Sequence, residues 1–191
     1  MLAGLTALAA IAVIIYYAVS KGYGLSDFWE KLKSLTSEAG FIGDAIVGTP
    51  LQKATALIAG FEGFSAKAYQ DADGWSIGYG HFITEDDPYD SNSHITAEEA
   101  SKLLQQDLER YVSCVDSSVT VDLTDNQRAA LYSLCYNIGC AGFQESSLLN
   151  LLNNGDLDGA ANAFGLYVKS QGNTLSALVN RREAEKAVFL S

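Results

Sequence analysis

The feature that most constrains the fold is a helical pattern that passes directly into a strand pattern. Over residues 51–61 apolar residues recur at the spacing of one buried helix face. Gly63 follows Glu62 and predicts the end of this helix. Short strands joined by a tight turn are expected next, over residues 68–71 and 75–81. The chain therefore combines helix with sheet and carries Glu62 to the edge of a small sheet.

The remainder of the C-terminal region is patterned as helices. Thr96 with Glu99, and Thr124 with Gln127, have the spacing of capping boxes that open helices. The expected helices cover residues 96–112, 124–135, 146–152, 157–168 and 175–190. We therefore predict an α+β domain over residues 51–191, with a small β lobe and a larger helical lobe.

The N-terminal segment has a different character. Residues 2–19 contain no charged residue and one weakly polar residue, Thr6. As a helix this run would be about 27 Å long, close to the apolar thickness of a bilayer. The sequence thus predicts a transmembrane or signal-anchor helix over residues 1–20, and a connector with a short amphipathic helix over residues 21–50. A cleaved signal peptide and a buried core helix are the alternatives.

The topology of this anchor is open at the level of sequence. Lys21, Lys31 and Lys33 follow the apolar run, and no Lys or Arg precedes it. The positive-inside rule would keep the C-terminal side in the cytoplasm. Three arrangements would still place the domain outside: an anchor that later leaves the membrane, assisted insertion, or residence in the membrane of a virus particle.

Charge and cysteine content exclude several functions. The formal net charge is -11 over 191 residues, which disfavours a nucleic-acid partner. Cys114, Cys135 and Cys140 do not match a zinc-site spacing, so we expect buried thiols, with one bridge left open. The acidic loop over residues 85–90 lacks EF-hand spacing, which favours a solvated loop over a calcium site. Neither a metal nor a cofactor is predicted.

Two carboxyl groups are the strongest candidates for chemistry. Glu62 lies nine residues before Asp71, across the helix-to-strand junction. Such a pair can reach opposite faces of one groove, which is the arrangement that glycosidases need. His81 has no metal-ligand partner at suitable spacing and is expected to be a hydrogen-bonded structural residue. For Arg181 and Arg182, substrate contact and intramolecular ion pairing both remain open.

Several segments are similar to one known family. Residues 62–71 and 74–81 resemble the signature of the phage-type lysozymes, glycoside hydrolase family 24. Further similar segments lie at residues 123–127, 136–139, 143–149 and 181–185. The resemblance covers residues 51–191 and implies the lysozyme-like fold.

The resemblance also implies an activity and the residues that carry it. The expected protein is a lysozyme, a muramidase that hydrolyses the β-1,4 bond between N-acetylmuramic acid and N-acetylglucosamine in bacterial peptidoglycan, by inversion, for phage lysis or entry. Glu62 would be the general acid, Asp71 the carboxylate that positions water, and Ser76 a hydroxyl that holds this water. Ser76 stands where the family usually has Thr, and one position nearer to Asp71. The expected substrate-binding residues are Tyr79, His81 and Asn137.

The surroundings of the acid and the location of the protein complete the prediction. To hold a proton near neutral pH, Glu62 needs partly apolar surroundings, which the nearby aromatic residues could supply. These are Phe61, Phe64, Trp75 and Tyr79. The expected partners are peptidoglycan, a membrane through residues 2–19, and virion proteins. The domain would act in the periplasm or cell wall, or from a virion membrane. The alternative is a membrane-anchored virion structural protein whose lysozyme-like domain only binds murein.

Overall fold

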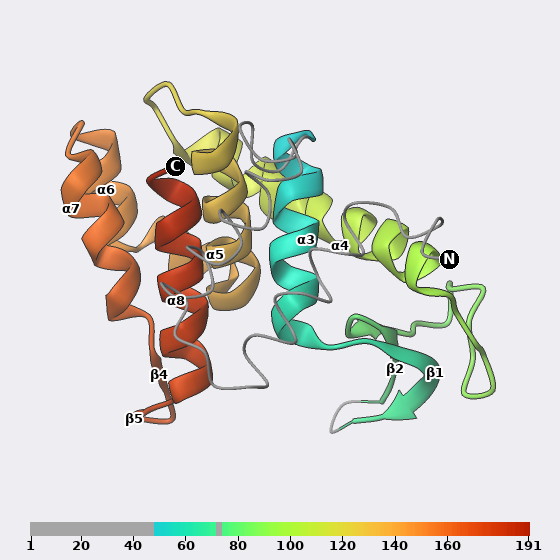
Figure 1. Ribbon diagram of the computed structural model, residues 1–191. Helices are drawn as coiled ribbons and strands as arrows, with labels where there is room; N and C mark the ends of the chain where they lie inside the picture. Colours follow the sequence, from blue (N-terminus) through green and yellow to red (C-terminus); the bar gives the residue numbers. More distant parts are fainter. Residues whose placement is uncertain (1–47, 72–73) are drawn as a thin grey trace, which may run out of the picture.

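A computed structural model describes residues 48–71 and 74–191, which form a small β lobe and a larger helical lobe (Figure 1). The elements are, in order, α3 (Pro50–Glu62), β1 (Ser65–Gln70), β2 (Trp75–Gly78), β3 (His81–Phe82), α4 (Ala97–Ser118), α5 (Asp125–Gln144), α6 (Ser147–Asn153), α7 (Leu157–Ala163), η1 (Phe164–Leu166), β4 (Lys169–Ser170), β5 (Asn173–Thr174) and α8 (Ser176–Phe189). The expected α+β class with a small sheet and a helical lobe is confirmed.

The N-terminal predictions fall almost entirely outside the described residues. The anchor over residues 1–20 lies outside them, as does the connector up to residue 47. None of the helices in the described part of the chain has the length and apolar character that crossing a membrane requires.

The β lobe is a three-stranded antiparallel sheet in the order β1-β2-β3. The strand expected over residues 75–81 is interrupted, which corrects the prediction. Gly78 and Gly80 have φ angles of 68° and 88°, a left-handed conformation that glycine adopts without strain, and the chain turns there to form β3. Ile77 of β2 is fully buried with Ala100 and Leu103 of α4, which fastens the sheet to that helix.

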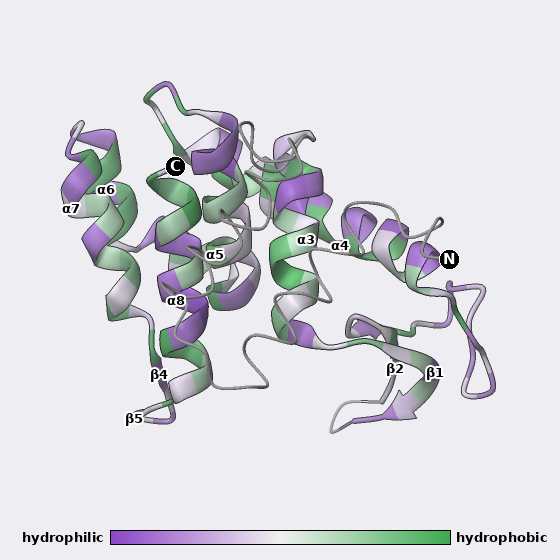
Figure 2. Ribbon diagram, viewed as in Figure 1, coloured by the Kyte–Doolittle hydropathy of each residue, from purple (hydrophilic) through white to green (hydrophobic). Residues whose placement is uncertain are grey.

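The helical lobe is built around α5, whose residues from Ala129 to Cys135 are buried. Figure 1 shows α5 between α3 and α8, with α6 and α7 outside them. Phe143, Phe164 and Phe189 fill the main core, each with 2% or less of its surface exposed. In Figure 2 part of α8 is strongly hydrophilic although the helix packs against the bundle, because Arg181 and neighbouring charged residues are buried there.

The helix starts follow local side-chain chemistry. Both predicted capping boxes are present, at Thr96 and Thr124, and a third at Thr49 opens α3. The helix ends are less well predicted. α4 and α5 extend to Ser118 and Gln144, and the helix expected over residues 157–168 is split into α7 and η1. The helices continue because core packing goes on beyond the region of clear periodicity, as the buried Val115 and Phe143 show.

The cysteines correct the expectation of three buried thiols. Cys114 on α4 and Cys140 on α5 form a disulfide, with their Cα atoms 6.1 Å apart. Cys135 is free and buried, and burial raises the pKa of its thiol to about 11. The pair could not be read from sequence spacing because its members lie on different helices, and the second part of α5 is redirected by a kink at Gly139.

Candidate active site

Glu62 is the last residue of α3, and Gly63 ends the helix with a φ angle of 75°. Its carboxyl group is partly exposed and faces the guanidinium of a residue near the C-terminal end of the chain. Nη1 of Arg181, on α8, donates a hydrogen bond to Oε1 of Glu62 at 2.7 Å, across 119 sequence positions. The ion pair joins the β-lobe end of α3 to the helical lobe and gives Glu62 a defined orientation.

Arg181 is itself held by a buried network. Its side chain is 5% exposed, and its Nε donates to Oε1 of Glu185, which is fully buried. Oε1 of Glu185 also accepts from Ser133 Oγ at 2.6 Å and from Arg182 Nη2 at 3.0 Å. Burial lowers the pKa of Arg182 to about 10, which leaves this guanidinium charged at neutral pH. Two arginines thus share Glu185, and only Arg181 extends to Glu62.

Asp71 and Ser76 form a second, more local pair. Ser76 Oγ donates to Asp71 Oδ2 at 2.6 Å, between residues five positions apart. Ser76 lies on β2 and is 2% exposed, whereas Asp71 is exposed just after β1. The backbone N–H of Asp71 donates to the carbonyl of Gly74 at 2.9 Å, which closes the turn below the pair. The predicted association of Asp71 with Ser76 is therefore present.

Tyr69 of β1 is a further residue beside Ser76 that was not predicted from the sequence. It lies opposite Ser76 in the register of β1 and β2. Burial raises the pKa of its phenol, and the negative charges of Asp71 and Glu62 raise this pKa further. The phenol of Tyr69 thus interacts electrostatically with both carboxyl groups. Alternation along β1 places Tyr69 on the face of Ser76, a signal that strand register could have supplied.

A cleft of about 590 Å³ opens beside Glu62. Its lining residues are Glu62, Gly80, His81, Phe82, Thr84, Asp107, Arg110, Tyr111, Tyr136 and Asn137. Three of the predicted site residues, Glu62, His81 and Asn137, thus meet in one cleft. Asp71, Ser76 and Tyr79 are not part of this lining. The cleft is walled by α4 and α5 on one side and by the β3 region on the other.

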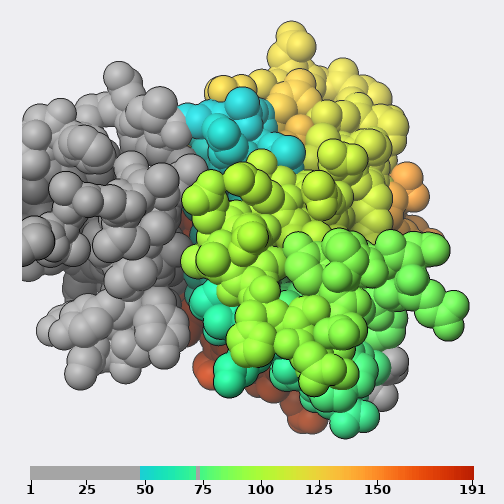
Figure 3. All heavy atoms as spheres, turned by 90° about the vertical axis from the view of Figure 1, so that its right-hand side faces the viewer, coloured from blue at the N-terminus to red at the C-terminus, as the bar shows by residue number. Residues whose placement is uncertain are grey.

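His81 is held by two carboxyl groups of the chain itself. Its Nδ1 lies 2.9 Å from Asp107 on α4, and its Nε2 lies 3.3 Å from Asp87. The hydrogen bond to Asp107 raises the pKa of His81, Asp87 adds to this effect, and burial opposes it. Figure 3 shows α4 and the segment that precedes it side by side on the face turned toward the viewer. These contacts agree with a structural histidine, and its contact with substrate stays a prediction.

Tyr79 and Asn137 are anchored in different ways. Tyr79 packs on the buried Ile58 and Ile77 clusters, and its ring centroid lies 5.5 Å from that of Phe64. Asn137 accepts a hydrogen bond from Arg182 Nη2 at 3.1 Å through its Oδ1. Asn137 therefore joins the cleft to the buried arginine network, whereas Tyr79 mainly supports the wall behind it.

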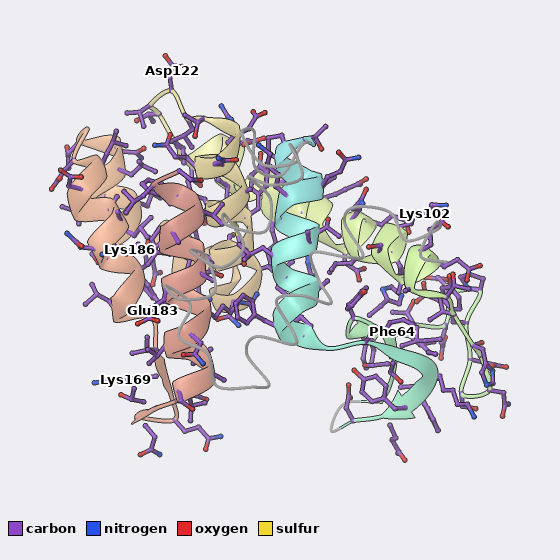
Figure 4. All side chains as sticks on the ribbon, viewed as in Figure 1. Phe64, Lys102, Asp122, Lys169, Glu183 and Lys186 are labelled. Atoms are coloured by element: carbon purple, nitrogen blue, oxygen red, sulfur yellow. A yellow bond between two sulfur atoms is a disulfide. The ribbon has the colours of Figure 1, made fainter. Side chains whose placement is uncertain are left out.

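The apolar surroundings expected for Glu62 differ in part from the prediction. Phe61 packs near Arg181, with the guanidinium carbon 5.5 Å from the ring centroid. Phe64 lies where α3 passes into β1 (Figure 4), but it is 44% exposed, and Trp75 is 38% exposed. Instead Tyr136 of α5 lines the cleft with Glu62 and forms its apolar wall, since its ring packs against the cluster of Ile58. Burial raises the pKa of Tyr136, and the charge of Glu62 adds to this effect. The position of Tyr136 beside Glu62 results from the packing of α5 against α3 and could not be predicted from the sequence.

The ion pairs of Arg181 and Arg182 on α8 are intramolecular. Both side chains are at most 5% exposed and face Glu185, as one of the two sequence hypotheses required. Glu183, two positions before Glu185, is exposed and points outward from α8 (Figure 4).

The chain is similar to a known protein family and to several phage proteins. The phage lysozyme family matches residues 59–185. The endolysin of Bacillus phage B103 is 40% identical over 138 residues, which cover 71% of this chain and 51% of that protein, so the chain spans about half its length. The SAR-endolysin of Enterobacteria phage P21 is 33% identical over 156 residues, 78% of this chain and 93% of that one.

A solved structure shares the fold. The muramidase domain of SpmX from Asticaccaulis excentricus superposes with a TM-score of 0.65 at 38% identity, over 72% of this chain and 95% of that one. The family match extends over both lobes and includes the helix end that carries Glu62. This chain belongs to the phage lysozyme family.

Proposed function

We propose that the protein is an endolysin that acts as a muramidase, hydrolysing the β-1,4 bond between N-acetylmuramic acid and N-acetylglucosamine in bacterial peptidoglycan. The observation that carries this proposal is the position of Glu62, whose carboxyl group lines the cleft and is oriented by Arg181. Asp71, which accepts a hydrogen bond from Ser76 on the adjoining hairpin, is the second carboxyl group that an inverting glycosidase requires.

Glu62 is the general acid of the proposed reaction. It donates a proton to the glycosidic oxygen as the bond to the muramic acid carbon breaks. Arg181 orients the carboxyl group through one nitrogen, while its Nε is bonded to Glu185. The positive charge of Arg181 is therefore shared between the carboxyl groups of Glu62 and Glu185.

Asp71 and Ser76 position the attacking water. Ser76 Oγ donates its hydrogen to Asp71 Oδ2, so its lone pairs remain to accept a hydrogen bond from water. Asp71 takes the proton that this water loses when it adds to the sugar carbon, and its charge stabilises the oxocarbenium-like transition state. The product then has the opposite anomeric configuration to the substrate.

Sugar binding falls to the cleft between the lobes. Tyr111 and Tyr136 provide aromatic surface along one wall, and Asn137 and His81 provide polar edges. Tyr79 supports the wall near Phe64. We assign His81 and Asn137 to substrate contact and Tyr79 to shaping the cleft.

The N-terminal region is proposed to tether the enzyme. Residues 1–20 would form the membrane anchor, residues 21–50 the connector, and residues 51–191 the domain that acts in the periplasm or cell wall. Two observations support this: the uncharged run over residues 2–19, and the similarity to SAR-endolysins from several phages. Fractionation of expressing cells, with the mature N-terminus sequenced, tests it. A domain found only in the cytoplasm would contradict the proposal.

The activity is tested with the full chain on purified peptidoglycan. We expect release of fragments whose reducing ends are N-acetylmuramic acid, identified by borohydride reduction and mass spectrometry. Glu62→Gln should reduce the rate by at least 1000-fold, roughly the scale of a general acid with its charge stabilisation. Glu183→Gln, which removes an exposed carboxyl group from α8, is the matched control and should keep the wild-type rate. Binding of peptidoglycan without any release of reducing sugar would refute the muramidase assignment.

A further inference from the structure

Among the described residues that line the cleft, Arg110 of α4 is the one cation, and no other described residue forms an ion pair with it. It is exposed and is the only Lys or Arg among the described residues that line the cleft. The other arginines of the described chain are all in ion pairs: Arg128 with Asp116, and Arg181 and Arg182 with Glu185. In an acidic protein, a cation that remains unpaired beside the site is available to an anionic ligand.

Arg110 is held against an aromatic wall. Its Nη2 donates to Tyr111 Oη at 2.7 Å, and its guanidinium carbon lies 4.6 Å from the Tyr111 ring centroid. These contacts orient the guanidinium without neutralising it, and they leave several N–H groups for a ligand.

The same wall leads from Arg110 to the candidate acid. The rings of Tyr111 and Tyr136 meet edge to face with centroids 5.3 Å apart. The Arg181 guanidinium carbon lies 5.9 Å from the Tyr136 ring, and Arg181 bonds Glu62. Arg110 therefore sits in the same cleft as Glu62, at the other end of a continuous row of packed side chains.

The chemistry of the proposed substrate identifies the anion. The sugar rings of peptidoglycan are neutral, and its carboxylates are carried on the muramic acid side chain, either on the lactyl group itself or on the peptide attached to it. A guanidinium binds a carboxylate through two parallel hydrogen bonds, which adds geometric selectivity to charge attraction.

We propose that Arg110 binds a carboxylate of the muramic acid side chain and makes the enzyme select carboxylate-bearing strands over neutral ones. This inference rests on the proposed muramidase function. Arg110 acts in binding and not in bond cleavage, so its loss is expected to change KM and to leave kcat nearly unchanged.

The test compares three substrates. Strands with intact peptides are set against the same strands with their carboxylates converted to amides, and against strands whose peptides have been removed to leave the lactyl carboxylate. For Arg110→Gln we expect KM to rise about tenfold on carboxylate-bearing strands, equal to about 1.4 kcal/mol. On amidated strands wild type and Arg110→Gln should have equal KM values. The two carboxylate-bearing substrates separate the sources, because the lactyl group of a strand with its peptide intact is an amide: dependence on Arg110 with intact peptides indicates a peptide carboxylate, and dependence found only on the peptide-free strands indicates the lactyl carboxylate.

Lys102→Gln is the matched control. Lys102 lies on α4 as well, is paired with Glu98, and points outward from the helix (Figure 4). The substitution removes the same charge and should leave KM unchanged. Arg110→Lys keeps the charge but not the planar fork, and should restore KM only in part. The advantage of wild type should also shrink as salt is added.

A binding assay separates this inference from the proposed function. Glu62→Gln and the double variant Glu62→Gln/Arg110→Gln are pelleted with insoluble peptidoglycan, so no turnover is needed. Weaker binding of the double variant supports the role of Arg110 even if wild type proves inactive. Equal binding of the two chains, or an equal loss with Lys102→Gln, overturns it. Unchanged Tm values for Arg110→Gln show that the fold is intact.

Discussion

The two candidate carboxyl groups are held in contrasting ways by the two lobes. Asp71 is bonded within the β lobe, where it accepts a hydrogen bond from Ser76 five positions away. Glu62 depends on the helical lobe, through Arg181 across 119 positions and then through the buried Glu185. The hydrogen bond between Ser76 and Asp71 therefore lies within one hairpin, whereas the ion pair of Glu62 forms only when α3 and α8 are packed in the folded domain. We therefore expect substitutions in the buried network of the helical lobe to alter the orientation of Glu62, and substitutions in the hairpin to alter only the surroundings of Asp71.

The largest effect is expected in the helical lobe, from Glu185→Gln. This change leaves two buried guanidinium groups without their common counter-charge, which costs roughly 3–5 kcal/mol of stability in comparable networks. Urea unfolding of both chains measures it. Glu183→Gln, two positions away and exposed, should stay within about 0.5 kcal/mol of wild type. Equal stability of the Glu185 variant would contradict the dependence on this network.

The disulfide of the helical lobe is expected to contribute slightly less. It closes 26 sequence positions between α4 and α5. A loop of this size corresponds to about 3.5 kcal/mol through the entropy of the unfolded chain. Unfolding with and without dithiothreitol measures the difference. The variant Cys114→Ala/Cys140→Ala should be insensitive to the reductant, whereas Cys135→Ala should remain sensitive, because it keeps the bridge.

In the β lobe, Ser76→Ala is expected to act mainly on the rate of catalysis. Loss of the hydroxyl removes a hydrogen bond to a carboxylate, worth about 1.5–3 kcal/mol, or roughly 10- to 100-fold in kcat. Ser76→Thr keeps a hydroxyl and should retain most of the rate. Ser65→Ala removes an exposed hydroxyl from β1 and serves as the control. A Ser76→Ala enzyme with full kcat would exclude the role in holding water.

The smallest effect is expected at His81, which joins the lobes through Asp107 and Asp87. Because the pKa of His81 is raised in the folded protein, its protonated form stabilises the fold. The stability difference between wild type and His81→Asn should be full below about pH 6.5, the unfolded value, and should decline as pH rises through the folded pKa. Urea unfolding between about pH 5 and pH 9 checks this, and a difference that grows with pH would contradict it.

Prediction from sequence succeeded where the determining contacts are local. The end of α3 at Glu62 follows from Gly63, and the starts of α4 and α5 follow from capping boxes within one turn. The hairpin that places Asp71 near Ser76 was recognisable from a few neighbouring residues. It failed where local signals compete: the strand over residues 75–81 was overridden by two left-handed glycines.

By itself, the sequence determined the identity of the candidate acid, the hairpin beside it and the two-lobed character of the domain. Only the tertiary structure decided that Arg181 orients Glu62, that Cys114 pairs with Cys140, and that Tyr136 forms the apolar wall. Each of these contacts joins elements far apart in the chain, and many packings of amphipathic helices are compatible with the same periodicity. The partner of a side chain is then settled by which helices meet, a property of the folded domain as a whole.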